Sequence, residues 1–205
     1  MATPGYIHGS DPRGSLPFCF LEVSVPRYAV FIDGAYLAKV LKLFGEPRID
    51  FLKLSESFRG NDERLRTYCY YCAPFQSAVP TREEQERKSR FDRFAAALDS
   101  LPRFQVRLGR LARRTDADGG LRFEQKMVDV LLTVDLVRLS SQNHIQRAVI
   151  VAGDSDFVPA IEAARDSGVV VQLCHGRRPS PHDQLVRACD EWLVIDHELL
   201  NAVRS

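Results

Sequence analysis

Short apolar runs alternate with helical patterns along most of this chain, and this alternation constrains the fold more than any other feature. Apolar runs at residues 28–32 and 148–152, and the largely apolar segment 169–174, have the length of buried strands. Apolar residues at helical spacing fill stretches between them, including residues 36–44 and 157–164. Strands that are apolar from end to end need cover on both faces, as in a parallel sheet between helices. The sequence therefore predicts a three-layer α/β/α fold with a mostly parallel central sheet.

Three further segments complete the expected architecture. Alternating apolar and polar residues lead to an Asp-Gly-Gly turn at residues 118–120, so we expect a β-hairpin near residues 104–123. Residues 128–139 are apolar nearly all round, which predicts a buried helix. Residues 181–192 are expected to begin the last helices, with Ser180 as the N-cap.

Length and composition set the domain organisation. The chain has 205 residues, and we expect a flexible arm at residues 1–26 followed by a single domain at residues 27–205. No run approaches the ~18 apolar residues that a membrane helix needs, and the first residues do not have the pattern of a signal peptide. The five scattered cysteines fit the reduced thiols of a cytoplasmic protein. Cys69 and Cys72 form a CxxC but lack the second close pair of a zinc site.

The charges of the chain nearly cancel, because 28 Lys and Arg stand against 27 Asp and Glu for a net charge of +1. This balance argues against nonspecific binding of polyanions, although it says nothing about local patches. One such patch lies at residues 103–123, which hold six arginines against two aspartates. Arg113 and Arg114 of the expected hairpin could contact a nucleic-acid backbone. Arginines on a hairpin also serve solubility and protect a sheet edge, and both interpretations stay open.

Carboxylates follow two of the expected strands at the point where each strand ends. Asp33 follows the first apolar run, and Asp154, Ser155 and Asp156 follow the run at residues 148–152. The carboxyl ends of parallel strands meet at one edge of an open sheet, which is where ligands bind. The same residues could instead serve only as helix caps and first-turn residues.

Two more aspartates, Asp129 and Asp135, lie in the apolar helical segment, where an unpaired charge would be costly. At about 100° per residue, six positions place them about 240° apart, so they do not share a face. Asp129, near the helix start, is expected to point to the sheet edge beside Asp33 and Asp154. Asp135, in the middle, is expected to meet an arginine or a backbone donor within the fold.

Several carboxylates at one place repel one another unless they take up protons or bind a cation. Hard oxygen ligands favour Mg²⁺ or Mn²⁺. Such an ion lowers the pKa of a bound water and stabilises the charge that develops when water attacks a phosphodiester. The sequence contains no phosphate-binding GxxxxGKS/T loop, no GxSxG elbow and no HExxH helix, so hydrolysis of a phosphodiester is the favoured chemistry.

Three groups of residues carry a family resemblance: Phe31-Ile32-Asp33-Gly34, Lys126 with Asp129 and Asp135, and Gly153-Asp154-Ser155-Asp156-Phe157. In their order and spacing the chain resembles the NYN domains, close to the LabA-like group of the PIN-like nuclease superfamily. The resemblance implies a metal-dependent ribonuclease with a catalytic, metal-binding cluster. It places that cluster at Asp33, Asp129, Asp154 and Asp156. It also implies that Lys126 holds a substrate phosphate, with Tyr36 and Ser155 as further substrate contacts.

The chain departs from the family pattern at two positions. Tyr36 stands where such domains often carry Asn, and Met127 stands where a small residue often follows the Lys. Because of these changes, a second hypothesis stays open, in which the chain is a non-catalytic regulator that binds RNA or a protein partner. A receiver-type phosphoacceptor fits poorly because it needs an acidic pair after its first strand. RNA is the expected partner and DNA a possible one, and no membrane partner is expected. An exposed apolar helix face around Trp192, Leu199 and Leu200 would support a homodimer, but core packing explains these residues equally well.

Overall fold

The structure is a computed structural model that describes residues 25–115 and 121–205. The strands are β1 (Arg27–Asp33), β2 (Glu63–Cys72), β3 (Phe104–Thr115), β4 (Leu121–Lys126), β5 (Arg147–Val151), β6 (Val170–Gly176) and β7 (Glu191–Ile195). The helices are α1 (Gly34–Lys42), α2 (Phe51–Ser57), α3 (Arg82–Asp99), α4 (Val128–Ser141), α5 (Val158–Asp166), α6 (Asp183–Ala188) and α7 (His197–Ala202), with a short 3₁₀ turn η1 (Ser155–Phe157).

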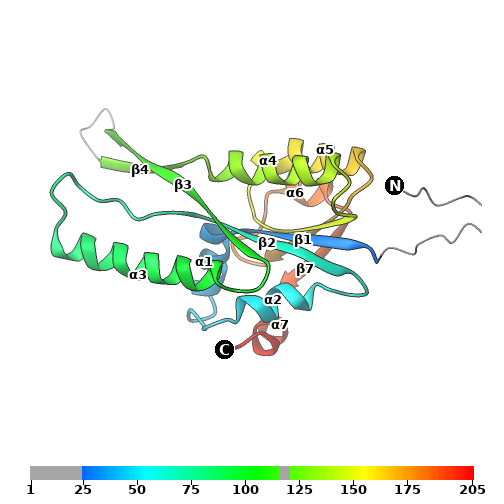
Figure 1. The fold of residues 1–205 in the computed structure, drawn as a ribbon, viewed down its shortest axis with the longest axis horizontal. Helices are drawn as coiled ribbons and strands as arrows, with labels where there is room; N and C mark the ends of the chain where they lie inside the picture. Colours follow the sequence, from blue (N-terminus) through cyan, green and yellow to red (C-terminus); the bar gives the residue numbers. More distant parts are fainter. Residues whose placement is uncertain (1–24, 116–120) are drawn as a thin grey trace, which may run out of the picture.

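In this part of the chain, the strands form one sheet in the order β4-β3-β2-β1-β5-β6-β7. All neighbouring strands run parallel except β3 and β4, which form an antiparallel hairpin. Helices α4, α5 and α6 cover one face, and α1, α2, α3 and α7 cover the other (Figure 1). The predicted three-layer α/β/α fold and its hairpin are confirmed, while the turn expected at residues 118–120 lies outside the described residues.

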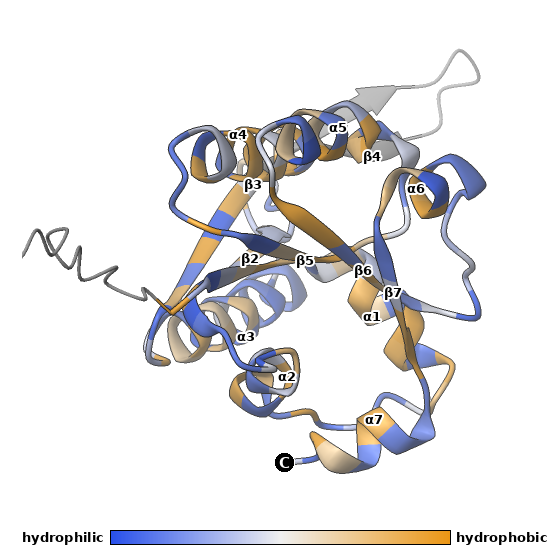
Figure 2. Ribbon diagram, turned by 90° about the vertical axis from the view of Figure 1, so that its right-hand side faces the viewer, coloured by the Kyte–Doolittle hydropathy of each residue, from blue (hydrophilic) through white to orange (hydrophobic). Residues whose placement is uncertain are grey.

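The two faces of the sheet support two separate hydrophobic cores. Along β1, the side chain of Phe31 packs into the core under α4 and α5, whereas Val30 and Ile32 pack into the core over α1 and α2. This alternation explains why the strand is apolar throughout, and Figure 2 shows the resulting hydrophobic colour of the central strands. Cys69 and Cys72 of β2 divide in the same way between the two cores, so the CxxC does not present its thiols to one metal site.

The order of strands creates a switch point between β1 and β5. The chain proceeds outward from β1 to β2 and β3, and later returns to place β5 on the other side of β1. Connections on the two sides of such a point leave in opposite directions, which opens a crevice at the carboxyl ends of the two strands. Asp33 ends β1, and Asp154 follows β5, so both lie at this crevice.

The C-terminal part of the chain differs from the prediction. Residues 191–195 form strand β7 instead of continuing a helix, and His182, not Ser180, is the N-cap of α6. Trp192 is 56% exposed on this strand, whereas Leu200 of α7 is buried in the core. Trp192 and Leu200 therefore do not share an exposed helix face, and a homodimer stays a prediction. Pairing with β6 makes β7 a strand, and a local sequence pattern does not reveal such pairing.

Helix α4 also differs from the prediction of a helix buried all round. Val130 and Val134 are 59% and 55% exposed, while Leu132 and Leu136 are fully buried against the sheet. The helix is one member of an outer layer, so one of its sides faces away from the sheet despite its apolar sequence.

None of the helices that the structure describes is long and apolar enough to cross a membrane. Of the arm expected at residues 1–26, residues 1–24 lie outside the described residues.

Candidate active site

Asp33 occupies the junction between β1 and α1. Its Oδ1 accepts hydrogen bonds from the backbone N–H groups of Ala35 and Tyr36, at 2.9 and 3.1 Å, so Asp33 is the N-cap of α1. Burial raises the pKa of this carboxyl, and the two backbone hydrogen bonds and the charge of Lys39 oppose that rise. The cap function considered from the sequence is therefore present, and it holds the carboxylate at the sheet edge.

Asp154 is placed in the same manner after β5. Its Oδ1 accepts a hydrogen bond of 3.1 Å from the backbone N–H of Asp156, and it is the N-cap of η1. Both Asp154 and Asp156 are exposed. Because β5 lies beside β1, this turn brings the carboxylate of Asp154 to the same crevice as that of Asp33.

Asp129 reaches the crevice from the first turn of α4, which begins after the hairpin. It is half-buried, and its pKa is raised by burial and then by the charges of Asp33, Asp154 and Asp156. The charges of Asp33, Asp154 and Asp156 therefore act on Asp129, and Asp154 also acts on Asp33. Asp135, six residues further along α4, pairs with Arg107 and faces a different part of the fold.

The donor set suits a hydrated Mg²⁺ or Mn²⁺ ion. Its donors are carboxylate oxygens, and the charges of Asp33, Asp154 and Asp156 help to raise the pKa of Asp129. Among the described residues, no group of three or more His, Cys, Asp or Glu side chains forms a ready-made metal cage. Mg²⁺ usually keeps several of its waters and takes only one or two protein carboxylates directly, so it does not require such a cage. The residues present fit the ion.

A cleft of about 320 Å³, here called the acidic cleft, opens beside these carboxylates. Asp33, Asp154, Tyr36 and Ser155 all line it, as do Lys39, Gly153, Pro179, Ser180 and His182. The sequence analysis missed Lys39 and His182. Lys39 follows the capping Asp33 by six positions, and His182 comes from a loop 149 residues after Asp33. Only Lys39 is therefore near enough in the sequence to be associated with the site, and that indication is weak.

The side chain of Tyr36 closes one wall of the acidic cleft. Its hydroxyl donates a hydrogen bond to the carbonyl of Pro179 at 3.2 Å and accepts one from the backbone N–H of Gly176 at 3.1 Å. The ring lies against Gly153, where any Cβ atom would collide with it. Where related domains often carry Asn, this chain thus has a residue that joins α1 to the loop after β6.

Asp135 has the structural role that the sequence predicted. It is buried, and its oxygens accept hydrogen bonds from Arg107 at 3.0 and 3.2 Å, from Arg138 at 3.1 Å and from the Tyr70 hydroxyl at 3.1 Å. The guanidinium of Arg107 also lies 5.8 Å from the ring centre of Tyr68. The charge is therefore compensated within the fold, as the sequence analysis required of an aspartate in an apolar helix.

Three other expected site residues lie on the hairpin. The backbone places Arg113 and Arg114 on β3 and Lys126 at the end of β4. Their side chains lie outside the described residues, so their contacts with a substrate stay predictions. Met127, directly after Lys126, has a left-handed backbone with φ of 77°. Glycine adopts this conformation without strain, which explains why related domains often place a small residue here.

Comparison with known proteins decides the family. The family model described as "NYN domain" matches residues 27–196, from the first strand to the cap of α7. The chain belongs to the NYN domain family. This membership points to the PIN-like nuclease superfamily and, for the site, to the use of a divalent metal.

Two proteins similar to this NYN domain have names that assign no activity. An uncharacterized protein, y4oD, from Sinorhizobium fredii (strain NBRC 101917 / NGR234) is 33% identical over 87 residues, which cover 40% of this chain and 41% of that protein. The chain therefore matches about two fifths of the length of this curated relative. A crystal structure of VPA0982, a protein of unknown function from Vibrio parahaemolyticus RIMD 2210633, has a TM-score of 0.58 at 17% identity. That alignment covers 85% of this chain and 95% of the Vibrio chain, so the fold is shared over nearly its whole length.

Proposed function

We propose that this NYN domain is a metal-dependent endoribonuclease that hydrolyses phosphodiester bonds of RNA in the acidic cleft. The observation that carries the proposal is the placement of Asp33 and Asp154 in one cleft at the switch point, with Asp129 near enough that burial and the charges of Asp33, Asp154 and Asp156 raise its pKa. A fold seldom keeps such a cluster for stability, because like charges destabilise it. Family membership supports the nuclease class, and the reduced cysteines favour action in the cytoplasm.

Asp33, Asp129, Asp154 and Asp156 would hold Mg²⁺ or Mn²⁺. The bound ion supplies a water of lowered pKa and neutralises charge that develops on the phosphate. The backbone hydrogen bonds to Asp33 and Asp154 fix the direction of their carboxylates before substrate arrives. Lys39 lines the same cleft and lowers the pKa of Asp33, so its ammonium stands where a substrate phosphate would need a positive charge.

Cleavage of labelled RNA tests the proposal. Single-stranded and structured RNA, and single-stranded DNA, are incubated with the protein in EDTA, Mg²⁺ or Mn²⁺. Cleavage of RNA is expected only with metal, and Asp154→Asn should lower its rate at least about 100-fold. Asp166→Asn, at the exposed end of α5, is the matched control and should leave the rate unchanged. Cleavage that persists in Asp154→Asn would come from a contaminating enzyme and would contradict the proposal.

Tyr36 favours a second candidate function, an RNA- or protein-binding regulator without turnover. Its hydroxyl is engaged by the loop after β6, so it does not offer the free amide that Asn would place in the cleft. RNA binding without metal-dependent cleavage would favour this second function. Tyr36→Asn separates the two further, since it should create or increase cleavage only if the missing amide limits turnover.

A further inference from the structure

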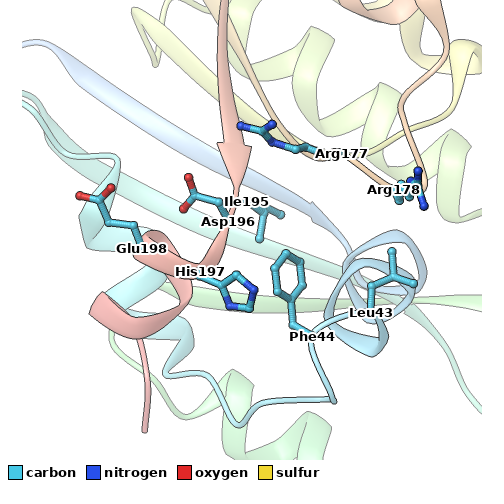
Figure 3. Close-up of a pocket in the computed structure, with 8 residues that line it drawn as sticks. All are labelled: Leu43, Phe44, Arg177, Arg178, Ile195, Asp196, His197 and Glu198. Carbon is cyan, nitrogen blue, oxygen red and sulfur yellow. The ribbon is translucent and has the colours of Figure 1, made fainter.

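A second groove opens at the same edge of the sheet as the acidic cleft. It has a volume of about 460 Å³, and its lining comes from the end of α1, the loop after β6, and the junction of β7 with α7. We call it the β7 groove and define it by Phe44, Arg177, Arg178, Asp196, His197 and Glu198 (Figure 3). Because β5, β6 and β7 are parallel neighbours, their carboxyl ends place the groove beside the cleft.

One loop borders both sites. Pro179 and Ser180 line the acidic cleft, whereas Arg177 and Arg178, directly before them, line the β7 groove. The Tyr36 hydroxyl holds this loop at two points through its hydrogen bonds with Gly176 and Pro179. A ligand that lies along the loop therefore reaches both the groove and the carboxylates.

The floor and walls of the β7 groove offer three kinds of chemistry. The rings of Phe44 and His197 meet edge to face, with their centres 4.8 Å apart. Figure 3 shows Arg177 and Arg178 across the groove from these rings, and the carboxylates of Asp196 and Glu198 at one end. Asp196 caps α7 through a hydrogen bond of 3.0 Å from Leu199, whereas Glu198 is exposed.

These groups match the three parts of one ribonucleotide. Aromatic faces stack on a base, guanidinium groups bind phosphate, and a carboxylate accepts a hydrogen bond from a ribose 2′-hydroxyl. Two arginines and two carboxylates in one lining leave little net charge, which suits a nucleoside with hydroxyls better than a bare polyanion. The volume is also in the range of about 300–1,000 Å³ that is typical of small-ligand sites.

We propose that the β7 groove binds one ribonucleotide of a single-stranded RNA that continues into the acidic cleft. This inference rests on the proposed function for its choice of RNA over a free nucleotide. A base can enter the groove only when it is unpaired, so the groove selects single strands. The carboxylate at Glu198 additionally favours RNA over DNA because only RNA carries the 2′-hydroxyl.

Binding in EDTA isolates the groove from cleavage. The anisotropy of a fluorescein-labelled 12-nucleotide RNA is titrated with wild type, Phe44→Leu, Arg178→Gln and Glu198→Gln. Phe44→Leu keeps apolar packing but removes the stacking face, and it should weaken binding about tenfold. Arg178→Gln, at an exposed loop position, should reduce the slope of log K against log salt by about 0.7. Glu198→Gln should reduce the preference for RNA over DNA of the same sequence.

Arg187→Gln is the matched control, since Arg187 lies at the end of α6 that leads to the start of β7, at the opposite edge of the sheet. It should change neither affinity nor salt slope. Wild-type affinity in both Phe44→Leu and Arg178→Gln would overturn the proposal, as would equal binding of duplex RNA or an absence of RNA binding by wild type. Displacement of the labelled RNA by adenosine monophosphate at micromolar concentration would overturn the choice of an RNA strand.

Cleavage by the same variants separates the two proposals. If metal-dependent cleavage persists while Phe44→Leu and Arg178→Gln bind and cleave as wild type does, the groove proposal fails and the nuclease stands. If both variants lose RNA affinity but wild type never cleaves, the groove proposal is supported and the nuclease fails. Loss of affinity together with a raised KM and unchanged kcat supports both.

Discussion

The ring of Tyr36 lies so close to Gly153 that a Cβ atom on Gly153 would stand 2.3 Å from Cε2 of the ring. The ring cannot swing away cheaply, because its hydroxyl is held by Gly176 and Pro179. Gly153 lies between β5 and Asp154, so this contact couples the wall of the acidic cleft to one of its carboxylates. The glycine of the family motif is thus needed here for close approach.

Gly153→Ala should therefore destabilise the protein by about 2 kcal/mol, because either the ring or the turn before Asp154 has to move. Urea unfolding measures the change. In a Tyr36→Ala background the same substitution should cost much less, since the colliding ring is absent. An equal cost in both backgrounds would show that the contact with Tyr36 is not its origin.

Asp135→Ala should destabilise the protein by about 3 kcal/mol, because it leaves Arg107 and the buried Tyr70 hydroxyl without their common partner. Thermal and urea unfolding measure this loss. Mg²⁺ affinity, measured by calorimetry on the folded variant, should stay unchanged because the carboxylate of Asp135 is already engaged by Tyr70, Arg107 and Arg138. Weaker Mg²⁺ binding in a variant with native circular dichroism would contradict the separation of the two aspartates on α4.

Asp129→Asn should have the opposite effect on stability. Burial and repulsion raise the pKa of Asp129 in the folded state, so the folded protein holds a proton more tightly than the unfolded chain does. The resulting loss of stability develops as pH rises above the unfolded pKa of about 3.9, and it is complete above the folded pKa. At pH 7 without metal, Asp129→Asn should raise the melting temperature by about 2 °C, and the gain should disappear near pH 4.

Divalent metal should act on the same repulsion. Mg²⁺ should raise the melting temperature of wild type at pH 7, with a smaller effect on Asp129→Asn, because the ion neutralises the charges that repel. Its affinity should rise with pH through the elevated pKa values of Asp33 and Asp129. Scanning fluorimetry from pH 4 to 8, with Ca²⁺ and Na⁺ as control ions, measures both effects. A metal effect that is independent of pH would argue against binding at these carboxylates.

Met127→Gly should stabilise the protein by about 1 kcal/mol, because Met127 adopts a φ of 77° that strains any residue with a Cβ atom. Met127→Ala keeps the strain and serves as the control for loss of the side chain. Urea unfolding should therefore rank the glycine variant above both the alanine variant and wild type. If glycine and alanine variants are equally stable, strain at this position does not limit stability.

The sequence by itself determined the fold class, the hairpin and the family. Strands buried on both faces, such as β1 and β5, must be apolar along their whole length, and this requirement is visible in consecutive residues. The ends of these strands also located Asp33 and Asp154, because parallel strands end at a common edge. The need of Asp135 for a partner, an arginine or a backbone donor, followed from the cost of an unpaired charge in an apolar helix.

Only the tertiary structure decided which other residues surround these carboxylates. Lys39 and His182 reach the acidic cleft because α1 and the loop before α6 fold over the same edge. Residues 191–195 become a strand through pairing with β6, and their short apolar run from Trp192 to Ile195 does not by itself distinguish a strand from a helix. Strand pairing and site assembly depend on contacts between residues far apart in the chain, whereas sequence periodicity reports only on near neighbours. The carboxylates that follow the strands can therefore be located from the sequence, whereas the other residues that line the cleft cannot.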